Sequence, residues 1–243
     1  MIKSVRFAHP HRLAALAALL CVPLAPTPAP APQGCHHGHE TQFSRARIYW
    51  EYNATDDDLG VHVTLDGEDW KRLRIERPDG RSLFEVKGKG PYQQLGMTEL
   101  FFEGAEPSLS EVPLSELLAD FPEGTYEFEG RTVDNEEIGA AAEFSHAIPD
   151  GPDVSATVGG PTSVTIEWTE VTSPPPGFPQ RPITIAGYQV IVESFQVTLP
   201  ASARSVTVPP EFVGSLTAGV HQFEVLAIEQ NGNQTLTVGE FSR

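Results

Sequence analysis

The residues best suited to chemistry form one short patch, Cys35-His-His-Gly-His39. A thiol and several imidazoles in one short segment can wrap around Zn²⁺, Cu²⁺ or Ni²⁺, because sulfur and imidazole are the ligands these ions prefer. The candidate metal ligands are Cys35, His36, His37 and His39. The competing interpretation is a tail whose histidines bind metal only adventitiously.

Two acidic turns are further candidates for a metal site. Asp56-Asp-Asp58 and Asp66-Gly-Glu-Asp69 carry carboxylates at alternate positions, as Ca²⁺-binding loops do. An EF-hand starting at Asp56 would need Gly and Glu where the sequence has Val61 and Gly67, so that template fails. Asp and Gly are also common turn residues, so a solvated turn is the alternative. The candidate Ca²⁺ ligands are Asp56, Asp58, Asp66 and Asp69.

Catalytic motifs give little support to an enzyme. The sequence has no Gly-x-Ser-x-Gly, no His-Glu-x-x-His and no phosphate-binding loop. His62, His146 and His221 fall in expected strands, where structural roles dominate. A glycosidase-type carboxylate pair would need a cleft, for which two domains of this size leave little room. We therefore expect no enzyme and no cofactor beyond a divalent metal.

The elements that must position these residues are β-strands, and part of the pattern repeats. Gly124-Thr-Tyr-Glu-Phe-Glu-Gly followed by Ala142-Glu-Phe-Ser145 resembles Gly219-Val-His-Gln-Phe-Glu-Val followed by Gly239-Glu-Phe-Ser242. Each copy reads as a turn, an alternating strand, a second turn and a closing strand. A repeated strand pair at this spacing predicts two β domains in tandem.

Alternation of apolar and polar residues places the strands. In the first half we expect strands at 47–52, 61–65, 70–75, 82–86, 98–103, 126–133 and 138–146, a turn at Asp66-Gly67 and a short helix at 115–120. In the second half, seven short strands predict a two-sheet sandwich. Asn231-Gly232 there predicts a type I′ hairpin turn. The expected core residues of this half are Trp168, Tyr188, Phe223 and Val225.

The second half resembles a fibronectin type III domain. Val164-Thr-Ile-Glu-Trp168, Ile185-Ala-Gly-Tyr-Gln-Val190 and Leu216–Ala227 match its core Trp, its core Tyr and its late alternating strand. His221 stands closest to the position of the family's corner tyrosine, whose bond to the backbone an imidazole could partly replace. The sequence has no Arg-Gly-Asp for integrin-type adhesion. The whole chain resembles secreted bacterial proteins of this two-domain plan, which offer no activity to transfer.

The start of the chain predicts export. Lys3, Arg6 and Arg12 precede the short apolar run Leu13–Leu20, which fits a secretory signal peptide better than a membrane span. Lipidation of Cys21 or Cys35 is the lesser alternative, so the protein is expected to be periplasmic or secreted. The expected organisation is a signal peptide and Pro-rich segment at 1–31, a His-rich flexible segment at 32–44, an immunoglobulin-like β-sandwich at 45–148 and a fibronectin type III-like domain at 149–243.

Charge and architecture set the expected role. A net charge of −17 opposes nucleic acid as a partner, because nucleic acid needs cationic contacts. We expect a monomeric binding or scaffolding module, without a transmembrane segment, that recognises a protein or glycan at the cell envelope. Metal binding through residues 35–39 is the alternative function. The first-choice contact loop lies within 172–182 and contains Pro174, Pro175, Pro176 and Phe178, with 53–60 and 66–69 as further candidates.

Overall fold

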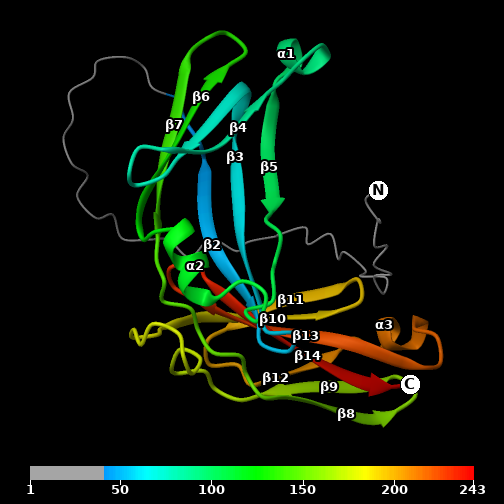
Figure 1. Ribbon diagram of the computed structural model, residues 1–243. Coiled ribbons are helices and arrows are strands. Elements are labelled where there is room, and N and C mark those ends of the chain that lie inside the picture. The colour runs from blue at the N-terminus through cyan, green and yellow to red at the C-terminus, as the bar shows by residue number, and fades with distance from the viewer. Residues whose placement is uncertain (1–40) are drawn as a thin grey trace, which may run out of the picture. The chain divides into compact units, whose positions relative to one another are not determined.

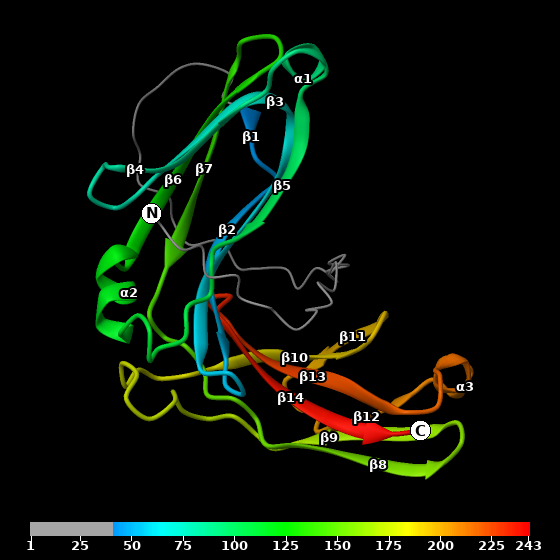
Figure 2. The same ribbon diagram turned by 45° about the vertical axis from the view of Figure 1, so that its right-hand side comes forward.

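The computed structural model describes residues 41–243, and their regular secondary structure is mostly β-strand (Figures 1 and 2). The first lobe holds β1 (Thr41–Gln42), β2 (Arg45–Asn53), β3 (Asp58–Glu76), β4 (Ser82–Lys87), α1 (Pro91–Leu95), β5 (Met97–Glu103), α2 (Leu114–Asp120), β6 (Gly124–Thr132) and β7 (Glu137–Phe144). The second lobe holds β8 (Val154–Gly160), β9 (Ser163–Trp168), β10 (Ile185–Val192), β11 (Phe195–Pro200), β12 (Ser205–Val208), α3 (Pro210–Ser215), β13 (Val220–Glu229) and β14 (Gln234–Ser242). The predicted all-β class is confirmed. The expected signal peptide and most of the segment 32–44 lie outside the described residues.

One long strand organises the first lobe. The sequence predicted two strands separated by a turn at Asp66-Gly67, but β3 continues through both, and this prediction is wrong. The first part of β3 pairs with β2 and β5, and its last part pairs with β6 and β4. The register of β3 against β5 shifts between Asp66 and Trp70, so the segment read as a turn is an irregular stretch where the strand changes partners.

Gly67 makes that stretch possible by its lack of a side chain. A Cβ at Gly67 would lie 2.8 Å from Cδ1 of Phe43 and 3.2 Å from its Cα, closer than packed carbons approach. Phe43 is buried in the first core, and the preceding β1 pairs with β7. The ordered first lobe therefore begins before the expected start at residue 45.

The strands of the first lobe enclose the first hydrophobic core. Trp50, Trp70 and Phe128 are fully buried, as expected for alternating strands, and Phe144 packs against Trp50 with ring centroids 5.2 Å apart. Each fully buried aromatic ring contributes roughly 2–3 kcal/mol through removal from water. The expected helix forms as α2 and adds Leu117 to this core.

The second lobe is a two-sheet sandwich. Strands β14, β13, β10 and β11 form part of one sheet, and β12, β9 and β8 form a separate one. The core between them contains the four residues expected from the sequence, and their burial is confirmed: Trp168, Tyr188, Phe223 and Val225. This division of strands is the one implied by the resemblance to fibronectin type III, so the strand order supports that fold.

A corner bond recurs in both lobes at equivalent positions. Tyr126 Oη donates to the carbonyl of Pro122 at 3.1 Å, and His221 Nε2 lies 2.8 Å from the carbonyl of Thr217. In each case the side chain binds the backbone four residues upstream, as in the tyrosine corner of sandwich domains. The expectation that an imidazole could replace the tyrosine in the second lobe is met.

The connection between β13 and β14 differs from the expected two-residue turn. Gly232 has a φ of 98°, whereas Asn231 is not among the residues with positive φ, so the type I′ prediction is wrong. The loop closes through Glu229 N–H donating to the carbonyl of Asn233 at 2.8 Å. Its asparagines have other partners: Asn231 Nδ2 donates to the carbonyl of Ala147 at 3.0 Å.

Buried hydrogen bonds join the two lobes. Strand β14 pairs in parallel with β2, so one sheet runs through both lobes. Asn233 accepts from Trp50 N–H at 2.9 Å, and its Nδ2 donates to the carbonyls of Ser145 and Ala147. All described residues fall within one compact unit. The domain boundary between 148 and 149 stays a prediction. The buried residues of the first core come before this boundary in the sequence and those of the second core come after it; the exception is Phe178, which belongs to the first core.

Candidate functional site

The Tyr92 loop, residues 88–96 between β4 and β5, presents apolar side chains to solvent. Tyr92 is 61% exposed and Leu95 is 73% exposed, and α1 buries none of its residues. The two side chains are three positions apart on one helical turn and therefore lie on the same face. Isolated exposed apolar residues are ordinary, but two on one face of a short turn form a small contact surface.

The backbone holds this loop in a compact form. Gly90 and Gly96 have φ of 56° and 75°, a region that glycine enters without strain. A Cβ at Gly88 would lie 2.7 Å from the carbonyl oxygen of Tyr92, so the chain closes tightly on itself there. The loop is thus preorganised, which reduces the entropy lost when a partner binds.

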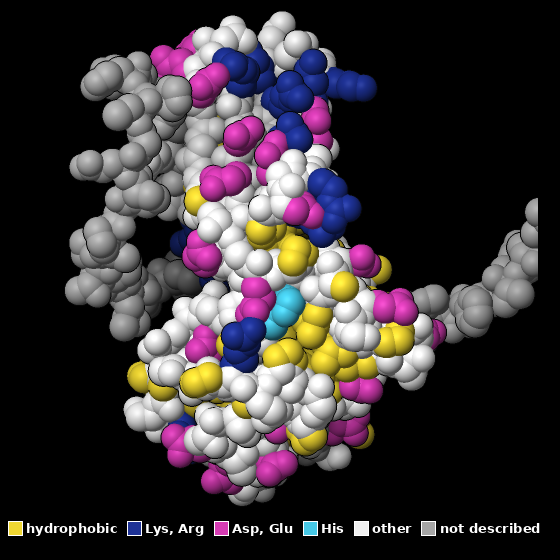
Figure 3. All heavy atoms as spheres, turned by 60° about the vertical axis from the view of Figure 1, so that its left-hand side comes forward, with side chains coloured by type: hydrophobic (Ala, Val, Ile, Leu, Met, Phe, Trp, Pro, Cys, Tyr) yellow, Lys and Arg dark blue, Asp and Glu magenta, His cyan; other side chains and the backbone are white. Residues whose placement is uncertain are grey.

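Basic side chains surround the Tyr92 loop. Lys87 precedes the loop and Lys89 lies within it, and both are exposed; Gly88 N–H donates to the carbonyl of Lys71. Arg72 pairs with Lys87 in the β3–β4 register and with Arg131 in the β3–β6 register. Figure 3 shows Lys and Arg side chains gathered at the upper end of the view, the end where Figure 1 places α1. Arg72 and Arg131 are paired with Glu85 and Glu137, so the positive charge closest to the loop in sequence comes from the exposed Lys87 and Lys89.

The contact loop predicted from the sequence does not present its aromatic ring. Phe178 is 6% exposed and packs on Tyr52 with ring centroids 4.8 Å apart. Pro174 and Pro175 are also buried, while Pro176 is exposed. The expectation of an exposed Phe178 is wrong, because the loop folds its ring into the first core and joins the lobes. A recognition role for this loop stays a prediction that the structure leaves untested.

The predicted Ca²⁺ ligands lie apart. Asp56 is exposed in the turn before β3, and Asp58 begins β3 and is buried. Asp66 and Asp69 lie further along the same strand, and the eight residues from Asp58 to Asp66 span about 26 Å at the usual strand rise. The four carboxylates therefore cannot form one site. The other predicted metal site, Cys35 to His39, lies outside the described residues.

Within residues 41–243, a different group gathers potential metal ligands: Glu51, His62 and Glu106, with ligand atoms within 4.8 Å of one another. His62 Nε2 lies 3.1 Å from Glu106 Oε1 and 3.8 Å from Glu51 Oε1. His62 is 4% exposed on β3, Glu51 lies on β2, and Glu106 follows β5. Three segments thus converge on one imidazole nitrogen.

Burial and charge shift the pKa values in this group. Burial raises the pKa of the Glu51 carboxyl above its usual value, and the charge of His62 opposes that shift. Burial acts to lower the pKa of His62, but the hydrogen bond with Glu106 and the carboxylate charges nearby outweigh it and raise it.

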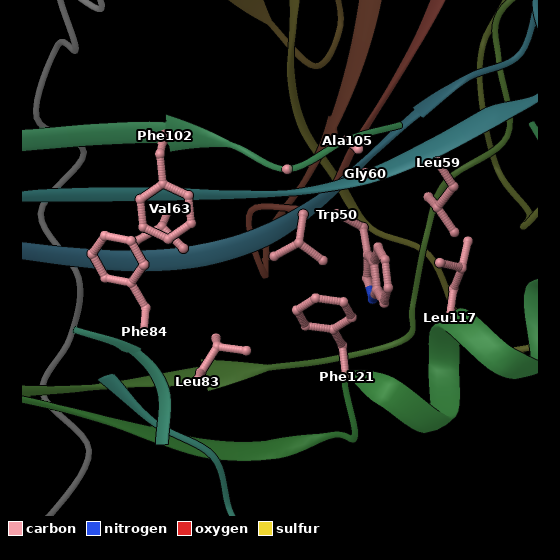
Figure 4. Close-up of a pocket in the computed structure, with 12 residues that line it drawn as sticks. Trp50, Leu59, Gly60, Val63, Leu83, Phe84, Phe102, Ala105, Leu117 and Phe121 are labelled. Carbon is pink, nitrogen blue, oxygen red and sulfur yellow. The ribbon is translucent and has the colours of Figure 1, made fainter. Parts of the chain in front are cut away.

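The first lobe also contains an apolar cavity of about 240 Å³ (Figure 4). Trp50, Phe84, Phe102 and Phe121 point into the space between the strands and α2. None of the residues that line it is ionisable: Trp50, Leu59, Gly60, Val61, Val63, Leu83, Phe84, Phe102, Gly104, Ala105, Leu117 and Phe121. The cavity offers no group for acid–base or nucleophilic chemistry.

Sequence reasoning missed both the Tyr92 loop and the Glu51–His62–Glu106 group. The first had a signal: Gly88, Gly90-Pro91 and Gly96 place turn residues around a tyrosine and a leucine. The second had none, since Glu106 is 44 residues from His62 and only the strand register brings them together.

Comparisons with known proteins give weak matches in fold alone. No family model matches the sequence, and no curated protein matches it either. The spore cortex lytic enzyme SleM of Clostridium perfringens aligns at a TM-score of 0.32 and 16% identity, over 39% of this chain and 28% of that one. A segment of two fibronectin type III domains from chicken tenascin aligns at a TM-score of 0.29 and 13% identity, over 83% of this chain and 99% of that one. Fibronectin(III)-like modules of Clostridium thermocellum CbhA align at a TM-score of 0.27 and 10% identity, over 80% of this chain and 92% of that one. The fold class rests on the strand order described above.

Proposed function

We propose that this chain is an exported, non-enzymatic binding module that docks a protein at the cell envelope through the Tyr92 loop. The observation that carries the proposal is the joint exposure of Tyr92 and Leu95 on one face of a turn held by glycines. Tyrosine is enriched among the residues that dominate binding energy at protein interfaces, and a preorganised loop loses little entropy on binding.

The chemistry of the loop favours a protein with an acidic surface beside an apolar patch. Lys87, just before the loop, and Lys89, within it, would attract carboxylates, which raises association rates and selects the orientation of the partner. Leu95 offers aliphatic area that suits an apolar side chain better than a sugar ring, whereas a glycan would rely on stacking against Tyr92 alone. A glycan partner is therefore the other outcome of the test.

Export rests on the leader expected over residues 1–31. Within residues 41–243, no helix is long and apolar enough to cross a membrane. The alternative function, metal binding through Cys35, His36, His37 and His39, rests on the sequence alone.

The test is capture from the native cell envelope by the full chain carrying a photo-crosslinking residue at Gln93, within the Tyr92 loop. We expect one dominant protein adduct, lost when Tyr92→Ala and Leu95→Ala are combined. The matched control is Val220→Ala, which removes an equally exposed apolar side chain, 64% exposed, from the second lobe. The proposal is wrong if the adduct survives the double substitution, or if Val220→Ala weakens it equally. Loss of the adduct after glycosidase treatment would identify a glycan instead.

A further inference from the structure

The geometry of Glu51, His62 and Glu106 fits a metal ion. In a tetrahedral site with bonds of about 2.1 Å, neighbouring ligand atoms are about 3.4 Å apart. The distances from His62 Nε2 to the two carboxylates, 3.1 and 3.8 Å, lie on either side of that value. Small side-chain movements would bring all three ligand atoms to bonding distance of one ion.

The surrounding residues hold these ligands in place. Tyr49 and Phe101 pack against the His62 ring, with centroids 5.3 and 5.9 Å away. The Gln234 amide donates to the second carboxylate oxygen of Glu51, leaving Oε1 turned toward His62. Hydrogen bonds of this kind orient metal ligands and raise affinity.

Gly60 makes room for the third ligand. It pairs with Glu51 in the β2–β3 register, and a Cβ there would lie 2.4 Å from Cγ of Glu106. Any other residue at position 60 would push Glu106 away from the strand. The absent side chain at position 60 thus leaves room for the Glu106 carboxylate beside the buried His62.

The local charge also favours a cation. The two carboxylates approach the same nitrogen, whose single proton can be donated well to only one of them. Glu103 lies opposite His62 in the β3–β5 register and adds further negative charge. Among the ion pairs between described residues, neither Glu51 nor Glu106 has a Lys or Arg partner: both pair with His62.

We propose that Glu51, His62 and Glu106 bind one divalent transition-metal ion of the Zn²⁺ type. One imidazole and two carboxylates suit Zn²⁺ and leave a fourth position for water. Ca²⁺ fits poorly, because it takes six to eight oxygen ligands and disfavours nitrogen. This site is separate from the Tyr92 loop and from the Cys35–His39 patch.

The test is calorimetric titration of Zn²⁺ into the full chain, in a background where Cys35→Ser, His36→Ala, His37→Ala and His39→Ala remove the patch. We expect this background to bind one Zn²⁺ and its melting temperature to rise with added Zn²⁺, since an ion that binds only the folded state stabilises it. Adding Glu106→Gln should weaken binding by about 100-fold or more, because losing a direct ligand costs at least as much as losing a residue that orients one.

The matched control is Glu103→Gln, which removes the same charge nearby without removing a ligand, and should change the affinity by less than about threefold. The proposal fails if the patch-free background binds no Zn²⁺, or if Glu106→Gln and Glu103→Gln weaken binding equally. Circular dichroism without metal checks that each variant folds. If Glu106→Gln does not fold, His62→Gln serves in its place, with the same loss expected.

Discussion

At the scale of single residues, His221 shows how a histidine at the corner position adds a charge requirement. Its Nε2 lies 2.8 Å from the carbonyl of Thr217, which can only accept a hydrogen bond. Its Nδ1 lies 3.1 Å from a Glu193 carboxylate oxygen, also an acceptor. A neutral imidazole carries one proton and satisfies one of them, so only imidazolium satisfies both. Tyr126, at the equivalent position of the first lobe, needs no charge.

This arrangement predicts a pH dependence of the free energy of unfolding. The hydrogen bonds to Thr217 and Glu193 raise the pKa of His221, while its burial and Arg243 act against them. A histidine whose pKa is raised by folding contributes stability that is fully present below its unfolded pKa of about 6.5 and is lost as the pH rises through the folded value. Urea unfolding from pH 5.5 to 8.5 should show this loss in the wild type. His221→Tyr should keep the corner bond and flatten the profile, and an equally steep profile in that variant would contradict the interpretation.

The corner bond of the first lobe gives a second prediction. Tyr126→Phe removes the hydroxyl that donates to the Pro122 carbonyl and keeps the buried ring. Loss of one such hydrogen bond should lower the free energy of unfolding by about 1 kcal/mol. Chemical denaturation at pH 7 measures it, with Tyr92→Phe, whose hydroxyl belongs to an exposed side chain, as the control that should change nothing. Equal effects of both substitutions would show that the corner bond contributes no stability.

Residues differ in how far the sequence predicts them. Trp168 and Tyr188 follow from alternation alone, because a period of two assigns a face without knowledge of strand partners. Phe178 does not, since a ring between prolines reads the same whether the loop points outward or folds back on the core. The Glu51–His62–Glu106 group needs the register of β2, β3 and β5, which no local pattern encodes.

At the scale of elements, the repeated hairpin keeps its faces but changes its register. In the first lobe Gly124 pairs with Phe144. In the second lobe the equivalent phenylalanine, Phe241, pairs with His221, which is two positions after Gly219, the equivalent of Gly124. The second copy has two more residues between its glycine and its closing phenylalanine than the first, and its strand register is displaced by two positions. An even slip keeps the same side chains in the core, while an odd one would turn them to solvent.

The slip places Gly239 opposite Phe223, and this yields a third prediction. A Cβ at Gly239 would lie 2.3 Å from Cζ of the Phe223 ring, which is 1% exposed and has little freedom to move. Gly239→Ala should therefore cost about 1–3 kcal/mol of stability through overpacking. Gly139→Ala is the matched control on β7, where the nearest atom would be the Phe128 carbonyl oxygen at an ordinary 3.4 Å. Thermal denaturation compares the two variants, and a Gly239→Ala protein as stable as the control would contradict the packing argument.

Strand β3 shows why the boundaries of elements were harder to predict than their type. Asp66-Gly67 has the composition of a turn, and turn residues also serve where a strand bends or another chain segment approaches closely. The decisive contact, Gly67 against Phe43, joins residues far apart in the sequence. The type I′ turn prediction at Asn231-Gly232 also overlooked a contact between residues far apart in the sequence: Asn231 Nδ2 donates to the carbonyl of Ala147.

At the scale of the whole molecule, the buried junction determines whether the two lobes behave as one. Asn233 is 1% exposed and bridges Trp50 N–H in the first lobe with the carbonyls of Ser145 and Ala147. The connecting segment 148–152 contains Pro149 and Pro152, which restrict its backbone. The structure adds a parallel pairing of β14 with β2 and a side-chain network that a single substitution can disrupt.

Asn233→Ala should uncouple the lobes. It leaves the Trp50 N–H and the Ser145 carbonyl without this partner, at a cost of about 1–3 kcal/mol for each group that finds no replacement, while the Ala147 carbonyl keeps its bond from Asn231 Nδ2. In the wild type we expect the calorimetric and van't Hoff enthalpies of unfolding to agree, as for one cooperative transition. In the variant the calorimetric enthalpy should exceed the van't Hoff value, because each lobe keeps its own hydrophobic core and can unfold separately. Gln222→Ala removes an exposed amide from β13 and should leave the ratio at one. If Asn233→Ala also leaves the ratio at one, the lobes are coupled by strand pairing and apolar contact rather than by this asparagine.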